Sequence, residues 1–282
     1  MSSLNYSELY RQIRDALTAA AITSPELEAR LIVEKASVKT RAEYIRDNAE
    51  LVPIEVVEAV KDFTKRRLSG EPAAYILGEW EFYSLPFFLN RDTLIPRADS
   101  ETLVMQAIEL LHGTSSPRVL DLCAGTGCLG IAVAKNVPDT ALTLTDISDG
   151  ALEMCRKNAA RNGVDAAVTT LDALESPPED AQYNMILCNP PYINTEDIKT
   201  LDKSVRDFEP HLALDGGVDG MRFYHAVAAK WKNAIVAGGH LLFECGINQA
   251  EEVRKILAHE GFSDITQVKD TAGIPRVVTG RK

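Results

Sequence analysis

The sequence of 282 residues has no apolar run long enough to cross a bilayer, and its first segment shows no signal-peptide pattern. It has five cysteines, none of which forms a C-x-x-C pair or has a histidine close by. An odd number of cysteines without a secretory signal indicates free thiols in a reducing compartment. We therefore predict a cytoplasmic protein with no metal site and no membrane contact, and we interpret its five histidines as structural or surface residues.

The sequence also lacks an excess of positive charge, because its formal net charge is −11. Enzymes that act on DNA or long RNA usually carry a basic surface, since neutralising phosphates supplies most of the nonspecific affinity. The short basic stretch at Lys65-Arg66-Arg67 is typical of a solvated helix end. The charge counts against a nucleic-acid partner and leaves a protein or a small molecule as the substrate.

Apolar residues make up 45% of the chain and charged residues 25%, as in ordinary soluble globular proteins. The length favours one large domain and one small domain. Residues 1–78 show helical spacing, with a helix start at Ser24-Pro25-Glu26, where the Ser24 hydroxyl is predicted to cap the helix, and a helix stop at Gly70. Without a titratable cluster, this region is most simply a substrate-docking or lid domain, and we predict substrate docking. Residues 79–97 predict a β-hairpin linker.

Residues 98–282 alternate between predicted strands and helices, most of them longer than ten residues, which indicates a doubly wound, mostly parallel sheet. The strands are predicted at 118–122, 141–146, 167–171, 183–189, 240–245, 265–269 and 276–279. The helices are predicted at 100–111, 128–136, 148–162, 220–236 and 248–260. The last two strands are close in sequence, so we expect one of them to be antiparallel.

A glycine turn follows the first of these strands, at residues 123–127, where a helix begins. Its glycines allow a sharp bend and let a ligand approach the backbone. Gly125, Gly127 and Gly130 also match the pattern G-x-G-x-x-G, which alone admits a dinucleotide. Asp146 ends the next strand, where an acid can accept both ribose hydroxyls, and Asp172 ends the third, where it can accept from an adenine amine.

Charge separates the two classes of cofactor. A dinucleotide carries a pyrophosphate, which prefers helix-terminal N–H groups, whereas S-adenosylmethionine carries an ammonium and a sulfonium. Asp121, just before the glycine turn, would repel the pyrophosphate and attract those cations. The alternative for Asp121 is an acid that pairs with a nearby backbone N–H.

The tetrapeptide Asn189-Pro190-Pro191-Tyr192 directly follows the fourth strand. Two prolines end a strand, because neither has an N–H for the ladder. The turn would bring the Asn189 amide, the Pro190 carbonyl and the Tyr192 ring into one small volume. Two oxygens and a ring suit a flat –NH2 group. The alternative is a strand-ending turn with a buried tyrosine. Because the tetrapeptide follows the glycine turn along the chain, we favour a binding site, and S-adenosylmethionine as its ligand.

The chain resembles the PrmC/HemK family, which methylates the side-chain amide of the glutamine in the Gly-Gly-Gln motif of peptide chain release factors. The resemblance covers essentially all of the sequence. It lies in the glycine turn and in Asn189-Pro190-Pro191-Tyr192-Ile193, and also in Tyr75-Ile76-Leu77-Gly78, Leu94-Ile95-Pro96-Arg97 and Gly217-Val218-Asp219-Gly220.

The resemblance implies a seven-stranded, Rossmann-like methyltransferase domain at residues 98–282, joined by the hairpin linker to an all-helical domain at residues 1–78. It implies that Asn189, Pro190 and Tyr192 act in catalysis and, with Pro191, bind the substrate. It implies S-adenosyl-L-methionine as cofactor, with S-adenosyl-L-homocysteine as product. The cofactor residues, with Asp121 added on the grounds of charge, would be Asp121, Cys123, Ala124, Gly125, Thr126, Gly127, Asp146, Asp172, Ala173 and Asn189.

The predicted function is therefore methyl transfer to release factors by a monomer, in support of translation termination. Two other methyltransferase substrates stay open, namely an exocyclic base amine of DNA or RNA and a ribosomal-protein glutamine. A non-catalytic module that senses the cofactor is the alternative from another class. We interpret Glu209, Asp219 and Glu244 as structural residues, and we assign no role to Arg97.

Overall fold

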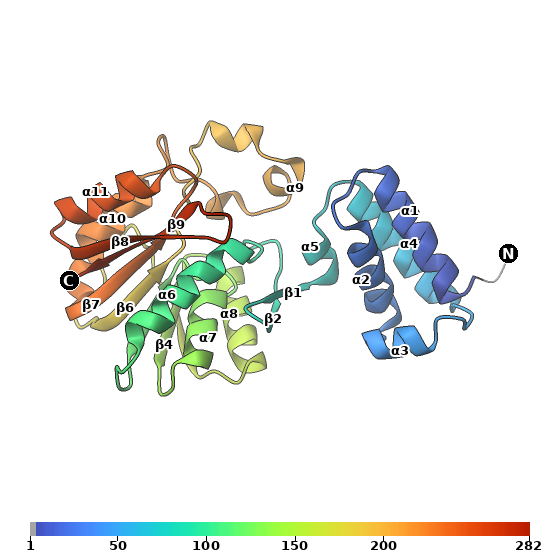
Figure 1. The fold of residues 1–282 in the computed structure, drawn as a ribbon, viewed down its shortest axis with the longest axis horizontal. Helices are drawn as coiled ribbons and strands as arrows, with labels where there is room; N and C mark the ends of the chain where they lie inside the picture. The colour runs from blue at the N-terminus through green and yellow to red at the C-terminus, as the bar shows by residue number, and fades with distance from the viewer. Residues whose placement is uncertain (1–3) are drawn as a thin grey trace. The chain divides into compact units, whose positions relative to one another are not determined.

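A computed structural model of the chain describes residues 4–282, which form two compact units divided between Gly78 and Glu79. None of the helices in this range is long and apolar enough to span a membrane. The first unit is helical, as predicted (Figure 1). Its helices are α1 (Tyr6–Ala19), α2 (Pro25–Ser37), α3 (Arg41–Arg46), α4 (Ile54–Leu68) and α5 (Ala73–Leu77).

Helix α1 shows why the first unit folds. A capping box starts it, in which the Asn5 side chain accepts from the Glu8 N–H at 2.8 Å and the Glu8 carboxylate accepts from the Asn5 N–H at 3.0 Å. Leu9, Ile13 and Leu17, at helical spacing, form a core with residues of α2 and α4. Helix α2 begins at Pro25, as expected.

One local prediction for this unit is wrong. Ser24 does precede α2, but its φ of 60° lies in the left-handed region and its hydroxyl makes no capping hydrogen bond. A capping side chain normally needs an extended backbone at its own residue to reach the N–H groups of the first turn. Pro25, which has no N–H to satisfy, marks this helix start instead.

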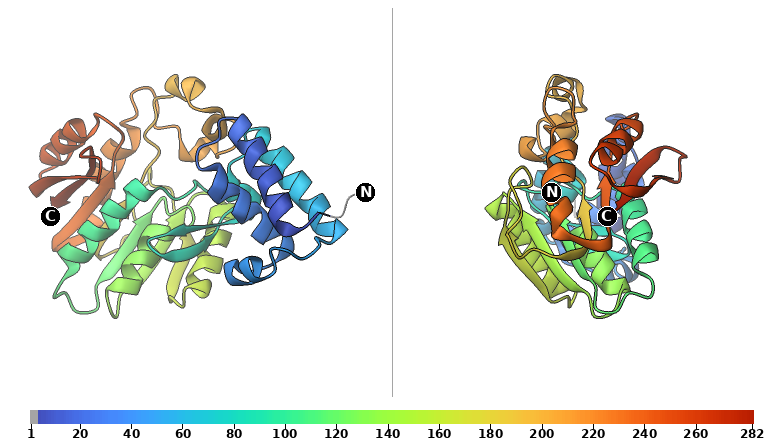
Figure 2. Two further views of the ribbon diagram at one scale, coloured as in Figure 1. Left: turned by 45° about the vertical axis from the view of Figure 1, so that its right-hand side comes forward. Right: turned by 90° about the vertical axis from the view of Figure 1, so that its left-hand side faces the viewer.

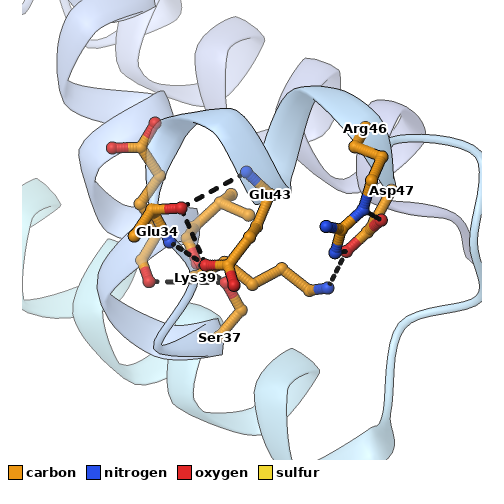
Figure 3. A network of polar contacts seen from close by, with 8 residues as sticks. Glu34, Ser37, Lys39, Glu43, Arg46 and Asp47 are labelled. Atoms are coloured by element: carbon orange, nitrogen blue, oxygen red, sulfur yellow. Dashed lines mark hydrogen bonds and ion pairs between the residues drawn. The ribbon is translucent and has the colours of Figure 1, made fainter.

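The link between α2 and α3 is held by ion pairs around a buried acid (Figure 3). Asp47 pairs with Arg46 at 2.6 Å and with Lys39 at 2.5 Å, although its side chain is only 6% exposed. The hydrogen bonds from Arg46 and Lys39 hold the pKa of Asp47 well below its usual range. These ion pairs join residues of the first unit to one another, so we interpret them as stabilising its fold.

The second unit is an α/β domain with a seven-stranded sheet, which confirms the predicted fold (Figure 1). The sheet order is β5-β4-β3-β6-β7-β9-β8, and β9 runs antiparallel to both of its neighbours. The strands are β1 (Glu79–Phe82), β2 (Leu85–Phe88), β3 (Arg118–Leu122), β4 (Ala141–Asp146), β5 (Ala166–Thr170), β6 (Tyr183–Cys188), β7 (Ile235–Glu244), β8 (Ser263–Lys269) and β9 (Pro275–Arg281). The helices are η1 (Ala98–Ser100), α6 (Glu101–Leu111), α7 (Cys128–Asn136), α8 (Asp149–Arg161), η2 (Asp197–Thr200), α9 (Lys203–Arg206), η3 (His211–Ala213), α10 (Arg222–Trp231), η4 (Lys232–Ala234) and α11 (Ala250–His259).

Helices cover both faces of the sheet (Figure 2). Side chains that alternate along the strands build a core on each face. Val119 faces one side with α6, α7 and α8, whereas Leu120 and Leu122 face the other side with α10 and α11. The strand order changes direction between β3 and β6, which lie side by side in parallel. Crevices for ligands form at such a point, beyond the carboxyl ends of the strands.

The predicted helix at 220–236 is too long. Helix α10 ends at Trp231, the short η4 follows, and β7 already begins at Ile235, five residues before the predicted strand. Trp231 is fully buried against the sheet, so the chain turns back there into the next strand. Only Lys232 and Asn233 interrupt the apolar residues here, and hydrophobic periodicity alone could not separate the end of the helix from the start of the strand.

The hairpin of β1 and β2 packs on α8. The Phe88 N–H donates to the Asn158 side-chain oxygen at 2.7 Å, and the Asn158 amide donates to the Phe88 carbonyl at 2.9 Å. The Arg161 guanidinium lies 4.1 Å from the centre of the Phe88 ring. The hairpin thus belongs to the same compact unit as the sheet.

Candidate active site

A cavity of about 490 Å³ lies at the carboxyl ends of the parallel strands. Its wall contains the residues that follow β3, β4, β5 and β6, which come together because these strands all point to one edge of the sheet. This volume is in the usual range for a small-molecule site. The predicted residues on the wall are Cys123, Ala124, Gly125, Thr126, Asp146, Asp172, Ala173, Asn189 and Pro191.

The glycine turn after β3 is tightly wound. Gly125 and Gly127 have φ angles of 56° and 78°, in the left-handed region that glycine adopts without strain. Three backbone N–H groups of the turn are engaged within the chain: Ala124 donates to the Thr145 carbonyl at 2.9 Å, Gly125 donates to an Asp146 carboxylate oxygen at 2.9 Å, and Gly127 donates to the Ala124 carbonyl at 2.7 Å. A pyrophosphate would need such donors free, so the turn is poorly suited to a dinucleotide.

Asp121 lies elsewhere than the sequence suggested. It is fully buried on β3 and is not part of the cavity wall. Its carboxylate accepts a hydrogen bond from the Gly130 N–H at 2.8 Å, which is the contact expected if Asp121 pairs with a nearby backbone N–H. A Cβ on Gly130 would lie 3.0 Å from the Asp121 Cβ, so only glycine lets α7 approach this closely. Burial raises the pKa of Asp121 to about 7. Its second oxygen has no partner within residues 4–282.

Asp146 and Asp172 both lie on the cavity wall. The oxygens of Asp146 accept from the N–H groups of Gly125 and Ser148, at 2.9 and 3.0 Å, and this fixes its carboxylate after β4. Burial raises the pKa of Asp146 despite these bonds. Asp172 is two residues beyond the observed end of β5 and accepts from the Leu174 N–H at 2.8 Å.

The side of the cavity near Asp172 is apolar. Ala173 is 4% exposed, and its carbonyl accepts from the indole N–H of Trp231 at 3.1 Å. Leu171 and Ile147 also lie on the wall. A flat, uncharged ring would therefore meet aliphatic surface here, with an acid at its edge.

The turn Asn189-Pro190-Pro191-Tyr192 is divided between the cavity wall and the layer behind it. Asn189 and Pro191 line the cavity, whereas Pro190 and Tyr192 do not belong to the wall. The Tyr192 carbonyl accepts from the Gln249 side-chain amide at 2.8 Å. The same Gln249 side chain accepts from the Gly246 N–H at 2.9 Å, so it joins this turn to the end of β7.

A second loop holds the turn from another side. The Ile193 N–H donates to the Leu214 carbonyl at 2.9 Å, and the Ile193 carbonyl accepts from the Gly216 N–H at 2.8 Å. A Cβ on Gly216 would lie 2.7 Å from the Tyr192 Cα, and one on Gly220 would lie 2.3 Å from the Tyr192 carbonyl oxygen. The glycines at 216 and 220 therefore permit close packing behind the turn.

Comparison with known proteins gives matches in both units. Residues 8–78 match a family described as the PrmC N-terminal domain, and residues 98–218 match the methyltransferase small domain. A release factor glutamine methyltransferase of Agrobacterium fabrum is 36% identical over 273 residues, which cover 95% of this chain and 94% of that protein. One of Neisseria gonorrhoeae is 37% identical over 258 residues, covering 91% and 93%. The chain belongs to the release factor glutamine methyltransferase family.

A solved structure outside this family shows the same fold. The catalytic domain of hMettl16, in complex with the MAT2A 3'UTR hairpin 6, aligns with a TM-score of 0.58 over 83% of this chain and 84% of that one. Its sequence is only 14% identical, so the likeness concerns the fold alone.

Several residues that line the cavity were not predicted as site residues from the sequence. His211, interpreted as structural or surface, lies on the cavity wall in η3, and Arg222 and Phe223 at the start of α10 join it. No motif marks His211 in the sequence. Arg222 follows directly on the glycine-rich stretch 216–220, which could have indicated it.

Arg97, to which the sequence assigned no role, also lines the cavity. Its guanidinium pairs with the Glu209 carboxylate, and the second Glu209 oxygen accepts from the Ile95 N–H at 3.3 Å. Glu209 is 5% exposed, so this pair ties the segment before α6 to the loop after α9. The pairing agrees with the structural role predicted for Glu209.

Proposed function

We propose that this chain methylates the side-chain amide nitrogen of the glutamine in the Gly-Gly-Gln motif of peptide chain release factors. The proposal rests on the family and on one observation, which is that Asn189 shares a cavity wall with Asp146 and Asp172. An amide that can accept from an –NH2 group thus lies beside acids that suit a nucleoside and its cationic side chain.

The cofactor of the proposed reaction is S-adenosyl-L-methionine. The cavity residues fit it, because three backbone donors of the turn, the N–H groups of Ala124, Gly125 and Gly127, are occupied, as a phosphate-free ligand allows, and because two acids and an apolar wall line the cavity. Cys123 to Gly127 would surround it, Asp146 would hold its ribose, and Asp172 and Ala173 would border its adenine. When bound, S-adenosyl-L-methionine supplies an electrophilic methyl group.

The chain's own task is to make a weak nucleophile reactive, because the lone pair of an amide nitrogen is delocalised into its carbonyl. The Asn189 side-chain oxygen and the Pro190 carbonyl would each accept one N–H of the substrate glutamine. The nitrogen becomes more positive as it reacts, so both hydrogen bonds would strengthen in the transition state. Tyr192 and Pro191 would keep the amide plane in place, which reduces the entropic cost of reaching the reactive geometry.

The first unit is proposed to dock the release factor, and the hairpin to connect it to the catalytic unit. Residues 4–78 form a core of their own, and the ion pairs around Asp47 stabilise this unit. This supports a recognition role, with chemistry confined to residues 98–282. The enzyme is proposed to work as a monomer in the cytoplasm, where release factors act.

The proposal is tested by incubating the protein with methyl-labelled S-adenosyl-L-methionine and an unmodified release factor, followed by peptide mass spectrometry. We expect the label on the glutamine side chain of the Gly-Gly-Gln motif. Parallel reactions contain a ribosomal protein fraction, DNA or RNA, which are the alternatives that the sequence leaves open. Label on one of these instead, or on no acceptor, would refute the proposed function.

A further inference from the structure

Glu244, the last residue of β7, is an acid that the proposed reaction does not use. Strands β6 and β7 pair in parallel with Cys188 opposite Phe243, so the next residues along them, Asn189 and Glu244, are neighbours at the edge of the sheet. Glu244 is only 3% exposed, and it does not belong to the cavity wall. A buried carboxylate beside a predicted catalytic amide calls for a physical reason.

The surroundings of Glu244 bind its carboxylate without fully satisfying it. The nearby Ser100 and Asn189 side chains and the charge of Arg276 favour the ionised form and act to lower the pKa of Glu244. Burial and the nearby Asp99 act in the opposite direction, with burial the largest effect, and raise the pKa of Glu244 to about 7. Its Oε2 has no hydrogen-bond partner within residues 4–282.

An ionised carboxylate selects one orientation of an asparagine amide. It can only accept hydrogen bonds, so an Asn189 side chain that bonds to the neighbouring Glu244 must turn its –NH2 end toward it. The Oδ1 end then remains for the cavity, which Asn189 lines. A neutral Glu244 can instead donate its O–H to Oδ1, and the flipped Asn189 would present an –NH2 group to a substrate –NH2 group, where no hydrogen bond forms.

We infer that Glu244 is a positioning residue, whose carboxylate holds the Asn189 amide with its oxygen toward the substrate nitrogen. This inference rests on the proposed function, because an amide substrate is the reason for presenting an oxygen. Glu244 acts through Asn189 and does not itself touch the substrate.

The orientation should depend on pH. Six groups with charge or titratable protons surround the Glu244 carboxylate, from η1, α7, α10, β9 and the segments after β6 and β7: Asp99, Cys128, Tyr192, Tyr224, Cys245 and Arg276. Arg276 pairs with Asp99 at 3.0 Å and with Asp270 at 3.1 Å, so its charge is already shared with two other acids. Glu244 therefore titrates near neutral pH, and the productive amide orientation is the one held above that pH.

The direct test is the NMR signal of the Asn189 side chain in protein labelled with ¹⁵N-asparagine, assigned by its loss in Asn189→Ala. We expect the –NH2 resonances of Asn189 to shift with pH, with a midpoint near 7, and to lose this shift in Glu244→Gln. Glu252→Gln makes the same change at an exposed acid on α11 and should leave the titration intact. Asn189 resonances that do not move between about pH 5.5 and 8.5 would overturn the inference.

The kinetic test compares the same variants with a release factor as substrate. For Glu244→Gln we expect a roughly 10- to 100-fold lower kcat at pH 8, with the KM for S-adenosyl-L-methionine changed less than about threefold, because only the transition-state contact is weakened. The wild-type kcat should fall about tenfold from pH 8 to pH 6, and that of Glu244→Gln should stay nearly flat. A Gln variant with wild-type turnover or with the wild-type pH profile would contradict the role of Glu244.

The two measurements separate this inference from the proposed function. If the wild-type protein methylates no release factor, the proposed function fails, and the NMR titration still decides whether Glu244 orients Asn189. If Glu244→Gln does not fold, the titration and the pH profile of the wild-type protein decide the matter without it.

Discussion

Replacing Asp121 by asparagine should make the stability of the second unit less dependent on pH. Asp121 is fully buried, and its pKa is raised from an ordinary 3.8 to about 7. Between these two values the native state holds a proton that the unfolded chain has lost, so the free energy of unfolding falls as pH rises. Stability from the neutral carboxyl is fully present below about pH 4 and is lost once the pH passes about 7.

The magnitude follows from the shift in the pKa of Asp121. About three pKa units at roughly 1.4 kcal/mol each amount to about 4 kcal/mol over the whole range, and to about 3 kcal/mol between pH 5 and pH 8. Asparagine has nearly the same shape and no titration in this range. Its –NH2 group would replace the oxygen that has no partner within residues 4–282, at a cost of about 1–3 kcal/mol that does not vary with pH.

Urea denaturation followed by tryptophan fluorescence is the suitable assay. Both tryptophans, Trp80 and Trp231, belong to the second unit, so the signal reports the unfolding of that unit alone. The difference in unfolding free energy between Asp121→Asn and the wild type should rise by about 3 kcal/mol from pH 5 to pH 8. Groups common to both proteins, Glu244 among them, cancel in this difference. Asp165→Asn, at an exposed acid, serves as the matched control. A difference that is constant with pH would show that Asp121 is not held neutral by burial.

Three further predictions concern the cavity. Asn189→Ala should lower kcat with a release factor by roughly 100- to 1,000-fold while the Kd for S-adenosyl-L-homocysteine changes less than about threefold; comparable losses in both would argue against Asn189 as the acceptor of the substrate N–H. Gly220→Ala and Gly273→Ala both place a side chain at a residue with a positive φ, 73° and 81° respectively, but only the Cβ at position 220 would meet the Tyr192 carbonyl oxygen. In steady-state assays we therefore expect turnover to fall more than about tenfold in Gly220→Ala and not in Gly273→Ala. Similar activity in these two variants would mean that the contact behind Tyr192 is unimportant. Asp146→Ala should raise the Kd for S-adenosyl-L-homocysteine about 10- to 100-fold by calorimetry, because the ribose loses its acceptor and the Gly125 N–H loses its partner; an unchanged Kd would remove Asp146 from the cofactor site.

The sequence by itself determined the elements that depend on local signals. The strand at Arg118–Leu122 and the helix at Cys128–Asn136 have the predicted bounds, because an apolar run ends in a glycine turn that suits a helix start. The proline pair after Asn189 ends β6 in the same local way, since neither proline can donate to the ladder. These signals lie within a few residues of the feature that they determine.

Tertiary structure decided which side chains meet. The contact of Asp121 with the Gly130 N–H depends on how closely α7 docks on β3, and sequence charge alone had placed Asp121 on the cofactor. The Tyr192 carbonyl is contacted by Gly220, which packs closely against it, and by Gln249, which donates to it. These residues lie 28 and 57 positions further along the chain. Asn189 and Glu244 come to lie next to each other only because β6 and β7 are neighbours in register. Such contacts depend on long-range packing, because burial and hydrogen-bond partners arise only when distant segments come together.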